Sequence, residues 1–156
     1  MFFFDQTSVG RTTRPVVLTV EEQDVLRFAS VIGETNPVHK DPKAARAAGY
    51  AGLVAPPIFA AVLVELAGEQ LRKSGEPDIV AIVAGENREL VHGLETFGFH
   101  APIVAGQLVE VTARVTGIDV AGDRLIQRAR LEISVNALDA GPLVTISRVI
   151  LQVVPE

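Results

Sequence analysis

The sequence predicts an α+β fold, with an antiparallel sheet wrapped around one long central helix in a single domain. Patterns typical of helices fill the chain before Gly75, and patterns typical of strands fill the chain after it. Residues 58–66 are apolar on nearly every side apart from Glu65, which is typical of a buried helix. The 156 residues, 48% of them apolar, suffice for one core but not for two domains of ordinary size.

The first elements are a short strand and an amphipathic helix. Residues 14–19 are rich in β-branched side chains and predict the strand. The sequence that follows has the form of a capping box, which opens a helix that Gly33 ends. The capping box comprises Thr19, Val20, Glu21 and Glu22. We expect the buried face of this helix to be formed by Val25, Leu26, Ala29 and Ile32.

Two further helices follow a polar loop at residues 34–40. Pro37 disfavours helical geometry at Asn36, so the loop cannot continue the first helix. Asp41 and Pro42 predict an N-cap and a first helical position, and Gly49 can end the short helix that they open. The central helix is predicted to begin near Pro57 and to run to about residue 73.

The second half of the chain predicts four strands, at residues 88–99, 107–118, 124–138 and 143–154. In the third strand, apolar and polar side chains alternate, which predicts an antiparallel strand with one face in water. The apolar set is Leu125, Ala129, Leu131, Ile133 and Val135, and the polar set is Arg128, Arg130, Glu132 and Ser134. Residues 121–123 and 139–142 are the expected hairpin turns, and glycines at 93 and 98 are possible kinks in the first strand.

Composition excludes several classes of function. The net charge of −5 is spread along the chain, so no basic stripe exists to bind nucleic acid. The absence of cysteine excludes a disulfide framework and a Cys nucleophile. The longest apolar run, residues 55–64, is well short of the ~20 residues that span a bilayer. We therefore expect a cytoplasmic protein that binds neither nucleic acid nor membrane, and whose apolar composition favours self-association.

Two motifs carry the most information about function. The first is the loop Gly33-Glu34-Thr35-Asn36-Pro37-Val38-His39-Lys40-Asp41. The second is Gly49-Tyr50-Ala51-Gly52-Leu53-Val54-Ala55-Pro56-Pro57, immediately before the central helix. Further along are Val91-His92-Gly93, Phe97 and Pro102-Ile103-Val104-Ala105-Gly106. The similarity to known proteins that these motifs carry covers most of the chain.

The first motif resembles the hydratase motif of MaoC-like enzymes, Gly-Asp-x-Asn-Pro-aliphatic-His, and Glu34 stands where that family has Asp. The other motifs resemble the single-domain branch related to mycobacterial (3R)-hydroxyacyl-ACP dehydratase subunits. This resemblance implies a hot-dog fold and the hydration or dehydration of acyl thioesters bound to CoA or to acyl carrier protein. It implies no metal and no cofactor. The protein is expected to form a homodimer, or a heterodimer with a related subunit.

The resemblance also implies which residues form the site. Hydration of an enoyl thioester needs a base, an acid and donors for the enolate oxygen. Glu34 and His39 are the expected acid–base pair, with Asn36 orienting the loop or a water molecule. The substrate is expected to lie against Gly52, Ala55, Pro56, Pro57, Ile58 and Phe59. Because Pro56 and Pro57 have no N–H, the donor for the oxygen must be Ala55, Ile58 or Phe59.

Other residues receive structural interpretations, and two other functions stay open. His92 and His100 lie in strand-like segments, so neither is assigned a catalytic role, and three histidines this dispersed predict no metal site. A non-catalytic subunit that shapes the substrate tunnel of a heteromeric dehydratase is the first alternative. A thioesterase is the second, and it would require a carboxylate on the central helix, where Glu65 is the sole candidate.

Overall fold

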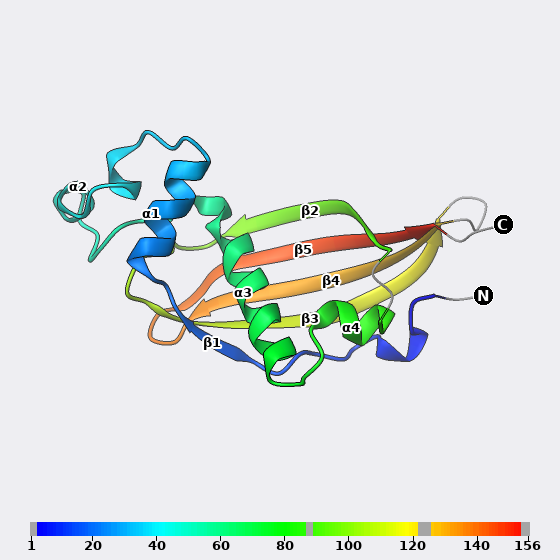
Figure 1. Cartoon of the computed structure of the whole chain (residues 1–156). Coiled ribbons are helices and arrows are strands. Elements are labelled where there is room, and N and C mark those ends of the chain that lie inside the picture. Colours follow the sequence, from blue (N-terminus) through cyan, green and yellow to red (C-terminus); the bar gives the residue numbers. More distant parts are fainter. Residues whose placement is uncertain (1–2, 87–88, 122–125, 154–156) are drawn as a thin grey trace.

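A computed structural model describes residues 3–86, 89–121 and 126–153. Five antiparallel strands form one sheet in the order β1-β3-β4-β5-β2, and α3 lies across one of its faces (Figure 1). The strands are β1 (Val16–Thr19), β2 (Val91–Phe99), β3 (Leu108–Ala121), β4 (Ile126–Ala137) and β5 (Gly141–Val153). The predicted α+β fold, with a sheet around a central helix, is therefore confirmed.

The helices fall into two groups at opposite ends of the sheet. At one end lie α1 (Glu22–Val31), the 3-10 turn η2 (Pro37–His39) and α2 (Pro42–Ala47), close to the 3-10 turn η3 (Pro57–Phe59) that opens α3 (Ala60–Lys73). Toward the other end lie the 3-10 turn η1 (Gln6–Ser8) and α4 (Ile79–Ala84). The polar loop and the start of the central helix are thus neighbours in space as well as in sequence.

The core lies between α3 and the sheet face that it covers. On β4, Ala129, Leu131, Ile133 and Val135 are buried, while Arg130 and Glu132 between them are exposed. The alternation predicted for this strand is therefore confirmed for its described residues, whereas Leu125 lies outside them. Each fully buried Leu, Ile or Val contributes roughly 1.5–3 kcal/mol by leaving water, so this face fixes the register of the sheet.

The central helix is buried on one side only. Leu63, Val64, Ala67 and Leu71 face the core, but Ile58 is 50% exposed and Val62 and Leu66 are partly exposed. The expectation of a helix buried on nearly every side is wrong for this chain by itself, because the sheet covers a single face of α3. The bounds predicted for the helix, about 57 to 73, are confirmed.

The predicted capping box is wrong. Thr19 is the last residue of β1, where it pairs with Leu108 of β3, and Glu21 occupies the N-cap of α1 without a side-chain hydrogen bond. Thr19 belongs to the strand because pairing within the sheet satisfies the hydrogen-bonding groups of its backbone. Of the expected buried face of α1, the buried residues are Val25 and Ala29; Ile32 is exposed and serves as the C-cap.

Helix α4 was not predicted. Its sequence is apolar and dominated by Ile and Val, a composition that favours strands. The side chain of Asp78 accepts a hydrogen bond from the backbone N–H of Ala81 at 2.8 Å, and this N-cap opens the helix. Gly85, at φ 60°, ends it. The short-range cap therefore decides the conformation against the strand propensity.

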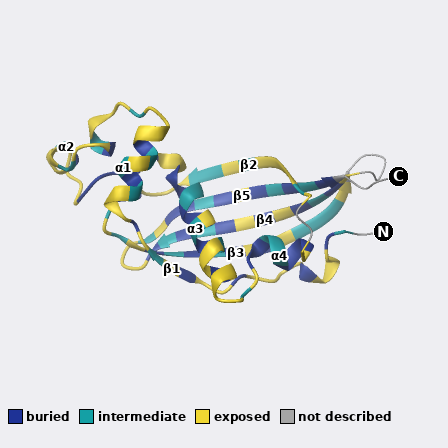
Figure 2. Cartoon of the chain, viewed as in Figure 1, coloured by how far each residue is buried: buried dark blue, intermediate teal, exposed yellow. Residues whose placement is uncertain are grey.

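Strand β2 is the exposed edge of the sheet (Figure 2). It begins at Val91, three residues after the predicted start, and the register shifts between His92 and Leu94, so the kink expected at Gly93 is confirmed. A Cβ at Gly93 would lie 2.8 Å from the Leu151 side chain, so a larger residue at this bulge would require Leu151 to move. Gly98 pairs with Thr145 without a register shift, so no kink occurs there.

Both predicted hairpin turns lie near the ends of β4. The second is confirmed, because β4 and β5 are joined at residues 138–140 and Gly141 adopts φ 83° at the start of β5. Of the first, Ala121 belongs to β3 and residues 122–123 lie outside the described residues.

Candidate active site

The loop between α1 and α2 is held by its own backbone and side chains. Gly33 adopts φ 71°, and the next residue, Glu34, donates its N–H to the carbonyl of Ala29, an arrangement that closes the end of α1. Asn36 then caps η2, because its Oδ1 accepts a hydrogen bond from the N–H of Val38 at 3.2 Å. The glycine and the Asn-Pro pair of the motif thus fix the place of His39 at the end of η2.

His39 is nearly buried and its ring orientation is set by the second motif. Nδ1 lies 2.7 Å from the carbonyl oxygen of Val54, and the backbone N–H of Val54 donates to the carbonyl of Val38 at 3.0 Å. A carbonyl can only accept a hydrogen bond, so Nδ1 must carry a proton. In the neutral imidazole Nε2 is then unprotonated, which is the form required of a general base.

The second motif is extended and pairs with the segment after β2. The N–H of Ala55 donates to Ile103 and that of Ala105 donates to Leu53, both at 2.8 Å. Glycine is favoured at position 52, because a Cβ would lie 3.0 Å from the carbonyl oxygen of Ala105, and that backbone would have to shift. Two motifs that are some fifty residues apart are thereby joined, and they form two walls of one cavity.

That cavity has a volume of about 350 Å³ and is lined in part by His39. Its walls are predominantly apolar, as expected for a pocket that receives an acyl group. The lining residues are His39, Val54, Ala55, Pro57, Phe99, His100, Ala101, Pro102, Ile103 and Val144. Of the site residues expected from the sequence, His39, Ala55 and Pro57 therefore meet in the cavity.

Glu34 and Asn36 lie on the loop beside His39 but do not line the cavity. Oε1 of Glu34 accepts hydrogen bonds from the backbone N–H groups of Thr35 at 2.9 Å and Asn36 at 3.1 Å. These two bonds, that from Asn36 first, lower the pKa of the Glu34 carboxyl below its ordinary value of 4.5, and the charge of His39 lowers it further. The Glu34 carboxyl is therefore ionised at neutral pH and is held by the backbone of its own loop.

The start of α3 offers one free backbone donor among the three expected. The N–H of Ala55 is taken by Ile103, and the N–H of Phe59 is taken by the carbonyl of Pro56. Expecting either group as a donor was therefore wrong. Among the described residues, the N–H of Ile58 has no hydrogen-bond partner, since first-turn groups of a helix have none within the helix.

The remaining residues expected to contact substrate have other surroundings. The Phe59 side chain is buried in the core, where its ring packs edge-on against Phe28 with centroids 5.6 Å apart. Pro56 is buried and Gly52 is enclosed against Ala105, while Ile58 is exposed. These four residues shape the helix start and its support, and none of them lines the cavity.

His100 received only a structural interpretation from the sequence. Its ring lies over Gly98, whose added Cβ would be 3.8 Å from the His100 ring atoms, and Nε2 lies 3.0 Å from Oγ1 of Thr145. His100 lines the cavity together with His39. The one available signal was its place two residues before Pro102, at the opening of a motif, and that signal gave no indication of the long-range contact with Thr145.

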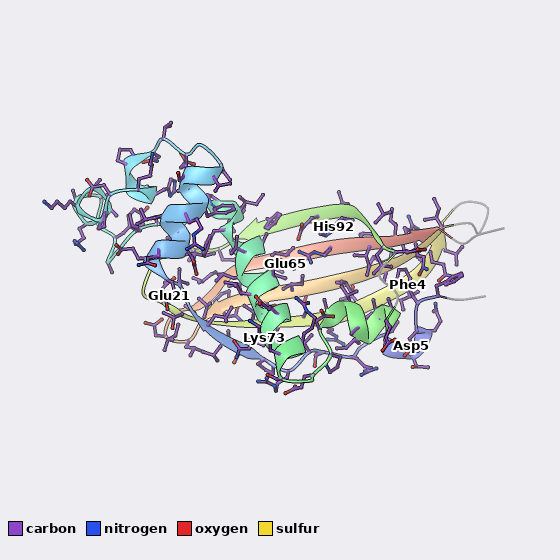
Figure 3. The ribbon with its side chains drawn as sticks, in the orientation of Figure 1. Phe4, Asp5, Glu21, Glu65, Lys73 and His92 are labelled. Atoms are coloured by element: carbon purple, nitrogen blue, oxygen red, sulfur yellow. The ribbon has the colours of Figure 1, made fainter. Side chains whose placement is uncertain are left out.

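Glu65, the carboxylate considered for a thioesterase, lies elsewhere. It is located in the middle of α3 (Figure 3), its side chain is 71% exposed, and its partner is Arg148 at 3.8 Å. Across the ranges that the structure describes, no group of three or more His, Asp or Glu residues is gathered as metal ligands. Within the same ranges, none of the helices combines the length and apolar character needed to cross a membrane.

Comparison with known proteins gives the family. A family model described as "FAS1-like, dehydratase domain region" matches residues 7–137. The chain belongs to this family. As a FAS1-like dehydratase-region protein it is 40% identical over 103 residues to a UPF0336 protein of Clavibacter michiganensis, covering 66% of this chain and 65% of that protein. It is 33% identical over 125 residues to a UPF0336 protein of Streptomyces avermitilis, covering 78% and 79%.

Solved structures show the fold of this FAS1-like dehydratase-region protein. The truncated HadBC (3R-hydroxyacyl-ACP dehydratase) complex of Mycobacterium tuberculosis matches with a TM-score of 0.74 at 17% identity, covering 93% of this chain and 97% of that chain. The R-hydratase PhaJ1 of Pseudomonas aeruginosa matches with 0.68 at 21%, covering 95% and 83%. A MaoC-like dehydratase of Rhodospirillum rubrum matches with 0.68 at 17%, covering 95% and 94%. The hot-dog fold and the MaoC-like resemblance are thus confirmed.

Proposed function

We propose that this protein is a hydro-lyase that interconverts a 2-enoyl thioester and the corresponding 3-hydroxyacyl thioester, with the acyl group carried by CoA or by acyl carrier protein. The observation that carries the proposal is the orientation of His39. Its Nδ1–H is committed to the carbonyl of Val54, so Nε2 is the nitrogen left for a ligand in a cavity with mostly apolar walls. The family, whose description names a dehydratase region, supports the same chemistry.

The proposed reaction needs one base that takes a proton and returns it. In hydration, Nε2 of His39 removes a proton from water as the water oxygen bonds to C3. The electron pair of the C2–C3 double bond moves to C2 and onto the thioester oxygen. The proton on Nε2 then passes to C2, so that a complete water molecule has been added. Dehydration follows the same steps in reverse.

Glu34 supports this proton transfer without touching the cavity. Its carboxylate is held by Thr35 and Asn36, and its negative charge stabilises the imidazolium that His39 becomes in mid-reaction. The N–H of Ile58, next to the cavity-lining Pro57, is the backbone donor available for the thioester oxygen. In this proposal Glu34 is thus a positioning residue.

The test is hydration of crotonyl-CoA and of a longer enoyl-CoA, followed by loss of enoyl thioester absorbance. The wild type is expected to be active, and His39→Ala to lose at least about 100-fold in kcat/KM. Arg46→Ala, an exposed change in the last turn of α2, is the matched control and is expected to keep full activity. An inactive wild type on both substrates would overturn the proposal.

A specific observation favours a second candidate function, a non-catalytic subunit of a heteromeric dehydratase. The edge strand β2 is unpaired on one side over nine residues and exposes Val91, Leu94 and Phe99. An exposed apolar edge of this kind favours pairing with another chain. Light scattering of the purified protein, together with the hydration assay, distinguishes the two. An active dimer supports the enzyme. An inactive protein that gains activity with a related subunit supports the alternative.

A further inference from the structure

The cavity holds a second imidazole whose role the proposed mechanism does not use. His100 follows β2 directly, and its ring lies close to Gly98, where an added Cβ would be in ordinary van der Waals contact with it at 3.8 Å. The backbone N–H of His100 is bound by the carbonyl of Leu143 at 2.9 Å. Its Nε2 is 3.0 Å from Oγ1 of Thr145 on β5. The backbone of His100 is therefore held by Leu143, and its exposed ring is held by Thr145 beside the cavity.

These contacts leave one ring nitrogen for a ligand. Among the described residues, Nδ1 of His100 has no hydrogen-bond partner. The Thr145 hydroxyl can donate its proton to Nε2, and Nδ1 then carries the ring proton and is a hydrogen-bond donor. The His39 ring has the opposite arrangement, since its Nδ1 is bound and its Nε2 accepts. One cavity thus contains an imidazole suited to accept a proton and another suited to donate a hydrogen bond.

The chemistry of the cavity requires such a donor. The negative charge that develops on a thioester oxygen is stabilised by hydrogen-bond donors, and removal of one donor typically costs about 10²–10³ in rate. At the start of α3, Pro56 and Pro57 have no N–H, and the N–H groups of Ala55 and Phe59 are occupied. Ile58 supplies one donor, and the cavity walls contain no side-chain donor other than the two histidines.

We propose that His100 donates a hydrogen bond from Nδ1 to the thioester carbonyl oxygen of the substrate, and that Thr145 fixes the tautomer that makes this possible. The inference rests on the proposed function, because it takes an acyl thioester as the ligand. It assigns a role to a contact between residues 45 positions apart that neither motif contains. His39 then takes a proton from the water that bonds to C3 and passes it to C2, while His100 stabilises the negative charge on the thioester oxygen.

Kinetics test this role with a control histidine on the preceding strand, β2. His100→Ala is expected to lower kcat for crotonyl-CoA hydration by about 100-fold, since the lost bond strengthens in the transition state. His100→Gln, which keeps a donor, is expected to recover part of the loss, and Thr145→Val to lose about tenfold while Thr145→Ser does not. His92→Ala removes an exposed histidine of β2 outside the cavity (Figure 3) and is expected to leave kcat unchanged. Equal kcat for wild type and His100→Ala would overturn the inference.

A spectroscopic measurement separates this inference from the proposed reaction. Crotonyl-CoA labelled with ¹³C at the thioester carbonyl is bound to the His39→Ala protein, and the carbonyl stretch is recorded by difference infrared spectroscopy. A shift to lower wavenumber that disappears on adding His100→Ala supports the hydrogen bond, even if the wild type proves inactive in hydration. A band at the same position with and without His100 overturns the inference while leaving the hydro-lyase proposal intact. Absence of binding overturns both.

Discussion

Two polar groups of residues beside α3 behave in opposite ways. Between β5 and the edge strand β2, Nε and Nη2 of Arg148 donate to Oε1 of Glu95 at 3.0 Å and 2.8 Å, and Nη1 lies 3.8 Å from Glu65. In the loop after α1, the polar groups also satisfy one another, but Nε2 of His39 is left beside a cavity. A buried polar side chain is thus common to both places, Arg148 in the first and His39 in the second. The nitrogen without a partner beside open space distinguishes the candidate site.

The largest expected effect concerns the stability of the paired group. Glu95→Ala removes the carboxylate whose Oε1 accepts two hydrogen bonds from Arg148, whose side chain is 8% exposed, and leaves a buried cation with one weak contact. Breaking a buried ion pair on one side costs roughly 3–5 kcal/mol, and the partial exposure of Glu95 places the expected loss near the lower end. Urea unfolding is the measurement, with the exposed Glu132→Ala on β4 as control. A loss below about 0.5 kcal/mol would show that Arg148 does not depend on Glu95.

The second effect concerns the loop and should appear in activity rather than stability. Glu34→Gln keeps the size of the side chain and its acceptor oxygen for Thr35 and Asn36, but removes the charge that stabilises the His39 imidazolium. We expect a loss of about 100-fold in kcat/KM, whereas Glu34→Asp keeps the charge and should lose no more than about tenfold. Equal losses for the two variants would mean that geometry, not charge, is what Glu34 contributes.

The difference between the two groups explains how far sequence could predict the site. Gly33, Asn36 and Pro37 encode the loop locally, through a positive φ, an N-cap and a fixed backbone angle, so the position of His39 was predictable. The contact between His100 and Thr145 depends on the pairing of β2 with β5, and no local sequence pattern predicts this contact. The same holds for Glu95 and Arg148, which are 53 residues apart.

The fold follows the same division. Strand β4 was predictable because one of its faces is buried along its described length. The partial exposure of α3 was not predictable, since it depends on how much of the helix a five-stranded sheet covers. Helix α4 was missed because the side chain of Asp78 outweighs the strand propensity of the Ile and Val residues that follow it.

The third prediction compares two N-caps of the same geometry. Asn36 caps η2 through Val38, and Asp41 caps α2 through Lys43 at 2.9 Å. Replacement of either by alanine should cost about 1 kcal/mol of stability. Only Asn36→Ala should also lower kcat/KM, by several-fold, because η2 ends at His39. Thermal unfolding and crotonyl-CoA hydration are measured on both, and equal activities would remove Asn36 from the site.

The smallest expected effect is a pH dependence of stability that arises from two carboxyl groups with lowered pKa values, Glu34 and Glu69. The pKa of Glu34 is lowered by backbone hydrogen bonds from Asn36 and Thr35, and that of Glu69 by the Lys73 side chain. A carboxyl whose folded pKa is depressed stabilises the fold above its ordinary value of 4.5, and this contribution disappears as the pH falls through the folded pKa. The difference in Tm between wild type and Glu34→Gln should therefore be largest near neutral pH and vanish in acid.

Salt separates the two carboxyls, because Glu69 and Lys73 form an exposed ion pair at 2.7 Å whereas Glu34 is bound by uncharged N–H groups. At 1 M salt the Debye length is about 3 Å, so the Tm difference of Glu69→Gln from wild type should shrink toward zero. That of Glu34→Gln should largely remain. If salt abolished both equally, the Glu34 carboxylate would be held by the loop's positive charges and not by its backbone, and its orientation toward His39 would then depend on ionic strength.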